Sequence, residues 1–177
     1  MIRPTHLTLD ISIGHKINNI YLSNLTHLTL NGNCDENIKK MNLPNLTHLK
    51  LGENFDNNIS NIDLSNLTHL VIDGNIQCLI NSLILPNLIN LTVGNVFGIY
   101  VHGMNLPKLI YLTLGNGFNQ PFCDINLPNL RYLTFGQRFE NTSIDFKDVN
   151  LPNLKQIIYK GVIYTGGLLR GFLFKSQ

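Results

Sequence analysis

Residues 43–63 read LPNLTHLKLGENFDNNISNID, and this unit decides the fold because it recurs along the chain. Its opening element, Leu-(Pro/Ser)-(Asn/Lys)-Leu, returns every 21 residues, except that the last copy follows after 24. The same phase extends back to Met1, so the repeats start near residues 1, 22, 43, 64, 85, 106, 127 and 151. Self-similarity at a fixed period of this length is typical of stacked-repeat architectures.

The spacing of apolar residues within the unit predicts one strand followed by an irregular return arm. Leu49 and Leu51, at positions 7 and 9, alternate with the polar His48 and Lys50, which is the period of a strand with one buried face. Gly52 follows at position 10, where the chain must turn off the strand. Because Asn and Gly crowd between the later apolar positions, we expect extended segments, turns or a short second strand there, not a full helix.

A single unit is too short to enclose a core, so neighbouring units must bury its apolar side chains. The chain is therefore predicted to be a β-rich solenoid with little helix, in which about eight 21-residue coils stack in parallel. We expect a single domain over residues 1–177, with a C-terminal cap at about 160–177. Leu should stack on Leu inside and Phe on Phe at position 13, and the Asn residues at position 3 should satisfy backbone groups in the bends.

Composition restricts the possible functions. The net charge is only +2, and no basic run is longer than Lys39-Lys40, so we expect no nucleic-acid partner. Neither a secretory signal nor a transmembrane span is visible, which predicts an intracellular, cytoplasmic protein without membrane contact. Acidic residues are sparse, and no catalytic or phosphate-binding motif occurs, so we expect no enzyme, no catalytic residue and no cofactor.

The outward positions 6 and 8 of the strands are predicted to line one continuous polar face that binds an unidentified protein partner. Solenoids present such surfaces, and Tyr is enriched among residues that contribute most to binding. The protein is expected to be a monomer. The candidate binding residues are His27, His48, His69, Thr29, Lys50, Asn90, Thr92, Tyr111, Thr113, Tyr132 and Thr134.

Other interpretations of this face remain open. Four His residues share position 6 (His6, His27, His48 and His69), and imidazoles on adjacent strands, about 5 Å apart, could bind a metal. No carboxylate or thiolate converges on them from elsewhere in the repeat, so no metal ligand is assigned, and a solvated ladder copied by repeat duplication is the simpler interpretation. A purely structural role is also open, because regular Thr ladders can order water or template assembly.

The unit also resembles known repeats. Leu46-x-x-Leu49-x-Leu51-x-x-Asn54 resembles the core segment of a leucine-rich repeat. The fuller unit resembles the FNIP repeat proteins of giant DNA viruses and social amoebae, most closely where Phe118-Asn119-Gln120-Pro121-Phe122 follows LPKLIYLTLGNG.

In that family an F-box commonly precedes the repeats and links them to ubiquitin ligase machinery. Here the first repeat begins at the initiator Met, so we expect no F-box. The resemblance implies a non-enzymatic protein-interaction module, or alternatively a substrate receptor for ubiquitin ligation that lacks its own F-box. If the protein is viral, it would act in the host-cell cytoplasm.

Overall fold

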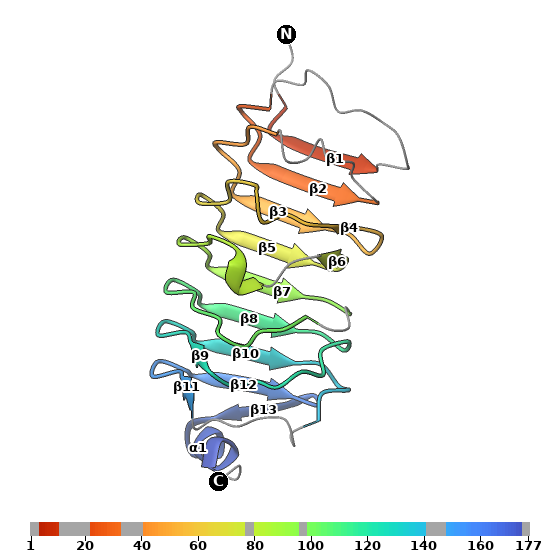
Figure 1. The fold of residues 1–177 in the computed structure, drawn as a ribbon. Coiled ribbons are helices and arrows are strands. Elements are labelled where there is room, and N and C mark those ends of the chain that lie inside the picture. Colours follow the sequence, from red (N-terminus) through yellow and green to blue (C-terminus); the bar gives the residue numbers. More distant parts are fainter. Residues whose placement is uncertain are drawn as a thin grey trace.

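The computed structural model describes residues 4–10, 22–32, 41–76, 80–95, 99–140 and 148–174, and it shows a parallel β-solenoid (Figure 1). Each repeat supplies one strand to a long sheet in which successive repeats lie side by side. The parallel strands are β1 (His6–Asp10), β2 (His27–Asn31), β3 (His48–Leu51), β5 (His69–Ile72), β7 (Asn90–Val93), β8 (Tyr111–Leu114), β10 (Tyr132–Phe135) and β12 (Gln156–Tyr159). The predicted β-rich solenoid with little helix is confirmed.

The solenoid has about six complete turns, slightly fewer than the eight predicted coils. Every repeat contributes a strand to the sheet, but a complete turn also needs a return arm, and the structure describes none for the first repeat or the last. The return arm of the first repeat falls on residues 11–21, outside the described residues. The last repeat leaves its strand through an antiparallel strand and a helix, so it does not return to form another turn.

Equivalent residues of successive repeats are direct neighbours across the sheet, as the period predicts. Leu28 pairs with Leu49, and Leu49 pairs with Leu70. The same ladder continues through Leu91, Leu112, Leu133 and Ile157. Because side chains alternate across a strand, this register sends positions 7 and 9 of every repeat into one interior and positions 6 and 8 to the opposite face.

The interior is apolar throughout the described residues, with no polar or charged side chain buried in it. Leu67, at position 4, and Phe55, at position 13, are both 0% exposed, and each such side chain stabilises the fold by about 1.5–3 kcal/mol through burial. Phe118 and Phe139 continue the position-13 ladder with ring centroids 5.4 Å apart. The predicted Phe core is confirmed at these positions, whereas Phe97 lies outside the described residues.

Asn side chains tie the bends of neighbouring coils together at position 3. The Asn45 amide donates to the Ser23 carbonyl at 2.6 Å, and the Asn66 amide donates to the Pro44 carbonyl at 2.8 Å. Equivalent bonds join Asn87 to Ser65, Asn129 to Pro107 and Asn153 to Pro128. The predicted role of these Asn residues is therefore confirmed, and each bond satisfies a carbonyl that the strand ladder does not reach.

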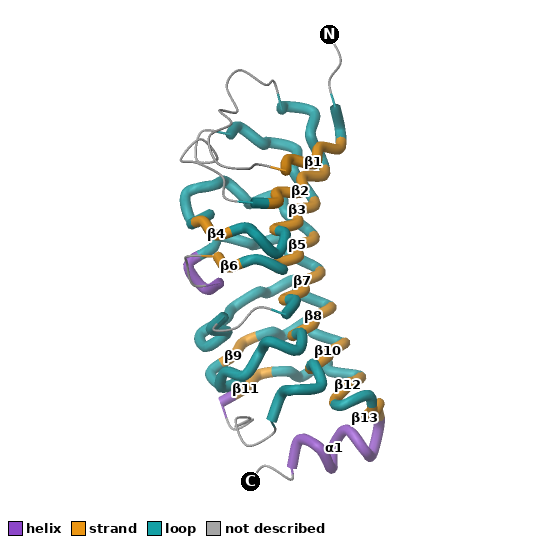
Figure 2. Tube along the Cα trace, turned by 90° about the vertical axis from the view of Figure 1, so that its right-hand side faces the viewer, coloured by secondary structure: helices purple, strands orange, loops and turns teal. Residues whose placement is uncertain are grey.

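The return arms contain only short elements, as expected. Strand β4 (Asp56–Asn57) pairs with β6 (Asn75–Ile76), strand β9 (Ile125–Asn126) pairs with β11 (Val149–Asn150), and Ile80–Ser82 forms the 3-10 helix η2. Figure 2 shows the main strands stacked along one side of the solenoid and the short strands along the other. The three extra residues before Leu151 fall largely on 141–147, outside the described residues.

The chain ends in a hairpin strand and a helix that lie over the last coil (Figure 1). Strand β13 (Val162–Thr165) pairs antiparallel with β12, and helix α1 (Gly166–Phe174) follows it. Leu169 and Phe172 of α1 are buried, and the Phe172 ring packs 4.7 Å from the Tyr164 ring. This helix has nine residues, and across the described ranges no helix has the length and apolar content that crossing a membrane requires.

Candidate functional site

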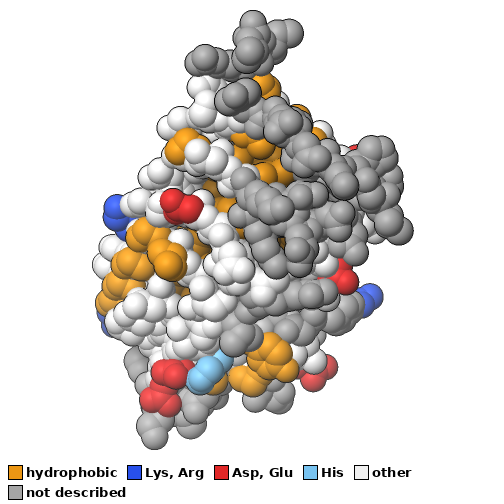
Figure 3. Space-filling view, turned by 45° about the horizontal axis from the view of Figure 1, so that its top comes forward, with side chains coloured by type: hydrophobic (Ala, Val, Ile, Leu, Met, Phe, Trp, Pro, Cys, Tyr) orange, Lys and Arg blue, Asp and Glu red, His pale blue; other side chains and the backbone are white. Residues whose placement is uncertain are grey.

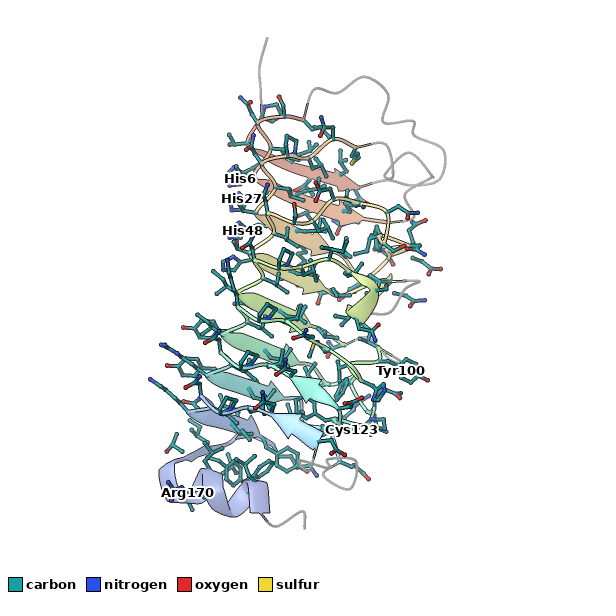
Figure 4. All side chains as sticks on the ribbon, turned by 60° about the vertical axis from the view of Figure 1, so that its left-hand side comes forward. His6, His27, His48, Tyr100, Cys123 and Arg170 are labelled. Carbon is teal, nitrogen blue, oxygen red and sulfur yellow. The ribbon has the colours of Figure 1, made fainter. Side chains whose placement is uncertain are left out.

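The outward side chains of the main sheet form a regular wall of two rows, which we call the polar wall. The position-6 row runs through His6, His27, His48, His69, Asn90, Tyr111, Tyr132 and Gln156, and the position-8 row through Thr8, Thr29, Lys50, Val71, Thr92, Thr113, Thr134 and Ile158. All the candidate binding residues predicted from the sequence lie on this wall. Figure 4 shows His6, His27 and His48 in a column along one side of the solenoid.

The four imidazoles of the N-terminal half stack face to face. Ring centroids are 4.1 Å apart between His6 and His27, 4.0 Å between His27 and His48, and 4.2 Å between His48 and His69. The ring planes deviate from parallel by only 9–16°. Stacking covers the ring faces, so the column presents ring edges to a partner.

A threonine before each stacked histidine fixes its orientation. The Thr47 hydroxyl donates to the Thr26 carbonyl at 3.1 Å, and the same oxygen lies 2.9 Å from Nδ1 of His48. A hydroxyl has one proton, and here the carbonyl takes it, so Nδ1 of His48 must carry the proton that the Thr47 oxygen accepts. The neutral imidazole is therefore protonated on Nδ1, and its Nε2 remains as a hydrogen-bond acceptor.

The same arrangement recurs one coil away in each direction. The Thr26 hydroxyl donates to the Thr5 carbonyl at 3.0 Å and lies 2.9 Å from Nδ1 of His27. The Thr68 hydroxyl donates to the Thr47 carbonyl at 3.0 Å and lies 2.9 Å from Nδ1 of His69. Three successive imidazoles thus share one tautomer, and the column presents a row of Nε2 acceptors at the coil spacing.

Protonation of the two central imidazoles, His27 and His48, is unfavourable in the fold. Desolvation by burial lowers the pKa of His48 below its ordinary 6.5, and repulsion from His69, His27 and His6 adds to the effect. The pKa of His27 is lowered by burial, and further by His6 and His69. His27 and His48 therefore favour the neutral form, because burial disfavours the charged ring and protons on neighbouring rings repel each other.

Acidification should consequently destabilise the solenoid through these residues. The folded-state pKa values of His27 and His48 lie below 6.5, so below that pH the unfolded chain binds more protons than the folded chain, and stability is lost as pH falls. Thermal unfolding followed by circular dichroism should give a lower Tm at pH 5 than at pH 8, and His48→Gln should show a smaller decrease. Asn90→Gln changes the next residue of the position-6 row without altering an imidazole, so its Tm should decrease between pH 8 and pH 5 as much as that of wild type. The same decrease in wild type and His48→Gln would contradict repulsion within the column.

The stacked geometry does not favour the metal-binding interpretation of the four histidines. A tetrahedral zinc site needs ligand atoms that converge on one point at about 2.0–2.3 Å. Parallel rings instead direct their Nε2 atoms side by side. In the part of the chain that the structure describes, no group of three or more His, Cys, Asp or Glu side chains is arranged to hold a metal ion.

The C-terminal half of the wall is aromatic. The Tyr111 and Tyr132 rings stack with centroids 4.9 Å apart and planes within 6° of parallel, and Tyr111 is 45% exposed. Asn90, on strand β7, lies between the imidazoles and these phenols in the position-6 row. Lys50, a predicted binding residue, forms an ion pair with Asp73 at 3.3 Å. The two halves of the wall therefore offer different chemistry.

Comparison with known proteins supports the repeat. Residues 23–54, which include β2 and β3, match the family model described as FNIP Repeat. The chain therefore contains an FNIP repeat. A search of curated proteins and a search of solved structures each gave no significant match.

Sequence analysis missed one cluster, which lies on the return arms. The Cys123 thiol lies 3.8 Å from Nδ1 of His102, whose Nε2 lies 3.6 Å from Asp124 Oδ2. His102 and Cys123 are 21 residues apart, so the period alone could have placed them side by side. Figure 4 shows Cys123 on the side away from the histidine column.

This cluster is an open group on the surface of the return arms. The Sγ–Nδ1 distance of 3.8 Å is within the reach of a weak hydrogen bond to sulfur. The side chains of His102 and Asp124 are 61% and 67% exposed, so solvent surrounds the group. The surface cavity nearby, of about 440 Å³, is lined by Asp124 but not by His102 or Cys123.

Proposed function

We propose that this FNIP repeat protein is a non-enzymatic interaction module that binds a partner protein through the polar wall. A repeat solenoid is typical of such modules, because stacked repeats extend one surface without changing the core. In the two rows of the wall, Lys50 is the one Lys, Arg, Asp or Glu, and a surface with few charges loses less hydration when a partner covers it. Figure 3 views the solenoid from the side of the return arms, where charged side chains appear as separate spots among uncharged groups.

Preorganisation of the wall is the observation that supports this proposal. Stacking holds the His27, His48 and Tyr132 rings, and the threonine hydroxyls orient the first two further. Immobilising a free side chain on binding costs about 0.5–1.5 kcal/mol, and a ring that is already held avoids part of that cost. The exposed edge of Tyr111 supplies an anchor of the kind enriched in binding surfaces.

Partner capture with matched variants tests this function. Wild type, a wall variant carrying His48→Ser, Tyr111→Ser and Tyr132→Ser, and the control Tyr100→Ser would each be fused to a proximity-labelling enzyme in the native cell. Tyr100 is 54% exposed and lies away from the histidine column (Figure 4). We expect a set of proteins labelled by wild type and by the control but lost with the wall variant. Identical sets for all three baits would contradict the assignment of the wall.

A further inference from the structure

In the C-terminal half of the solenoid, three of the six Lys and Arg residues that the structure describes after residue 85 lie where the chain enters the strands. Lys108 occupies position 3 of its repeat, and Arg131 and Lys155 occupy position 5 of theirs, and all three side chains are exposed. The segments 85–92, 106–113, 127–134 and 151–158 contain no Asp or Glu. The acidic residues that the structure describes in this half lie on the return arms instead: Asp124, Glu140 and Asp148.

The backbone register joins these cations into a strip along the solenoid axis. The Lys155 amide donates to the Arg131 carbonyl at 2.9 Å, and the Arg131 amide donates to the Ile110 carbonyl at 3.0 Å, so position-5 residues of three coils are adjacent. We call Lys108, Arg131 and Lys155 the cationic strip. It borders the polar wall, because Tyr111 directly follows Ile110 and Tyr132 directly follows Arg131.

A surface pocket of about 280 Å³ lies within this strip. Lys108 and Arg131 line it together with Asn129 and the half-buried side chains of Ile89 and Ile110. The Lys108 ammonium donates to Asn87 Oδ1 at 2.6 Å, which holds it in place and leaves its other two N–H groups. Within the described ranges, no carboxylate forms an ion pair with any of the three cations.

From this arrangement we propose that the cationic strip binds an extended acidic segment of the partner protein. Carboxylates of that segment pair with Lys108, Arg131 and Lys155, and an apolar side chain enters the pocket against Ile89 and Ile110. The inference rests on the proposed function and specifies the chemistry of the partner. Complementary charge of this kind fixes the position of a bound segment and speeds its association.

The same features distinguish a protein segment from a nucleic acid. Tyr111 and Tyr132 already stack on each other, so the faces between them cannot receive a base. The pocket between Lys108 and Arg131 has an isoleucine lining, which suits an apolar side chain better than a phosphodiester. The three cations are also few compared with the 6–10 phosphate contacts of a strongly salt-dependent nucleic-acid binder.

Peptide selection followed by titration tests this inference on the full chain. Random twelve-residue peptides displayed on phage are selected against wild type, and the enriched peptides are labelled with fluorescein and titrated by fluorescence anisotropy. The test variant carries Lys108→Gln, Arg131→Gln and Lys155→Gln. The control Arg138→Gln removes an exposed cation of the same half that lies on a return arm, outside both the strip and the polar wall. Because all the cations replaced are exposed, thermal unfolding should show that both variants fold like wild type.

We expect the enriched peptides to be rich in Asp and Glu and to carry at least one apolar residue. Their affinity should fall about tenfold or more in the triple variant, change less than about twofold in Arg138→Gln, and weaken with added salt. Absence of peptide binding, peptides without acidic enrichment, or equal affinity for the triple variant would overturn the inference. Binding of a labelled twelve-nucleotide poly(U) that is tighter than binding of the selected peptides would also overturn it. If binding depends on Tyr111 and Tyr132 but not on the strip, the inference fails while the proposed function survives.

Discussion

Gly115→Ala should destabilise the solenoid by about 3 kcal/mol or more, because the preceding coil leaves no space for a side chain. A Cβ at this position would lie 2.3 Å from the Gly94 carbonyl oxygen, 2.6 Å from the Gly94 carbonyl carbon and 2.9 Å from the Val93 carbonyl oxygen. These are backbone atoms, so no side-chain rotation relieves the overlap. The Gly115 amide also donates to Val93 at 2.7 Å, and separating the coils would break that bond.

Chemical denaturation of Gly115→Ala and of a matched glycine variant checks this prediction. Gly171 lies within α1, and a Cβ there would meet nothing within 4 Å. Gly171→Ala should therefore leave stability unchanged or raise it by up to about 1 kcal/mol, because Ala favours a helix over Gly. Equal effects of the two substitutions would show that the coils do not approach each other as closely as described.

Leu70→Ala should have the second large effect, a loss of about 2–5 kcal/mol. Leu70 is 0% exposed and stacks between Leu49 and Leu91 in the interior ladder, so truncation leaves a cavity that both neighbours line. Val71 is the next residue of the same strand and faces the polar wall. Val71→Ala removes apolar surface of which part is exposed, so its cost should stay near or below about 1 kcal/mol.

Equilibrium unfolding of both variants under the same conditions measures the difference. A solenoid with the register described here requires Leu70→Ala to cost clearly more than Val71→Ala. The reverse order would mean that the two faces of β5 are exchanged, because a slip of one residue moves every side chain of a strand to the other face.

The backbone register could be predicted from sequence because two periods agree. The 21-residue repeat fixes which residues are neighbours across the sheet, and the alternation around Leu49 and Leu51 fixes which face they take. Phe55 and Phe118 at position 13 followed from the same counting and are buried as predicted. These features depend on the spacing of apolar residues, which the sequence contains directly.

Side-chain geometry could not be predicted in the same way. The bond between Thr47 and His48 depends on rotamers that place the hydroxyl between a carbonyl and an imidazole, and spacing carries no information on rotamers. The stacking of Tyr111 on Tyr132 is of the same kind. The first and last repeats also depart from the consensus arrangement, which is why the count of complete turns was too high.

The distribution of charge shows how a linear pattern can conceal a cluster. Lysine and arginine look scattered along the chain, because Lys108, Arg131 and Lys155 are separated by 23 and 24 residues. These separations are close to one repeat, so the coiling brings all three to the same edge of the sheet. Analysis of position within the repeat, not of runs along the chain, would have revealed the cationic strip.

Disulfide formation between engineered cysteines tests the register most directly. In a background with Cys34, Cys78 and Cys123 changed to Ser, Thr92→Cys with Thr113→Cys places thiols on register partners of adjacent strands, about 5 Å apart. The control pairs Thr92→Cys with Thr134→Cys, two coils or about 10 Å apart. After mild oxidation, mass spectrometry of proteolytic fragments should find a bridge in the first protein and none within a chain of the second. A bridge in the second, or none in the first, would contradict the stacked register.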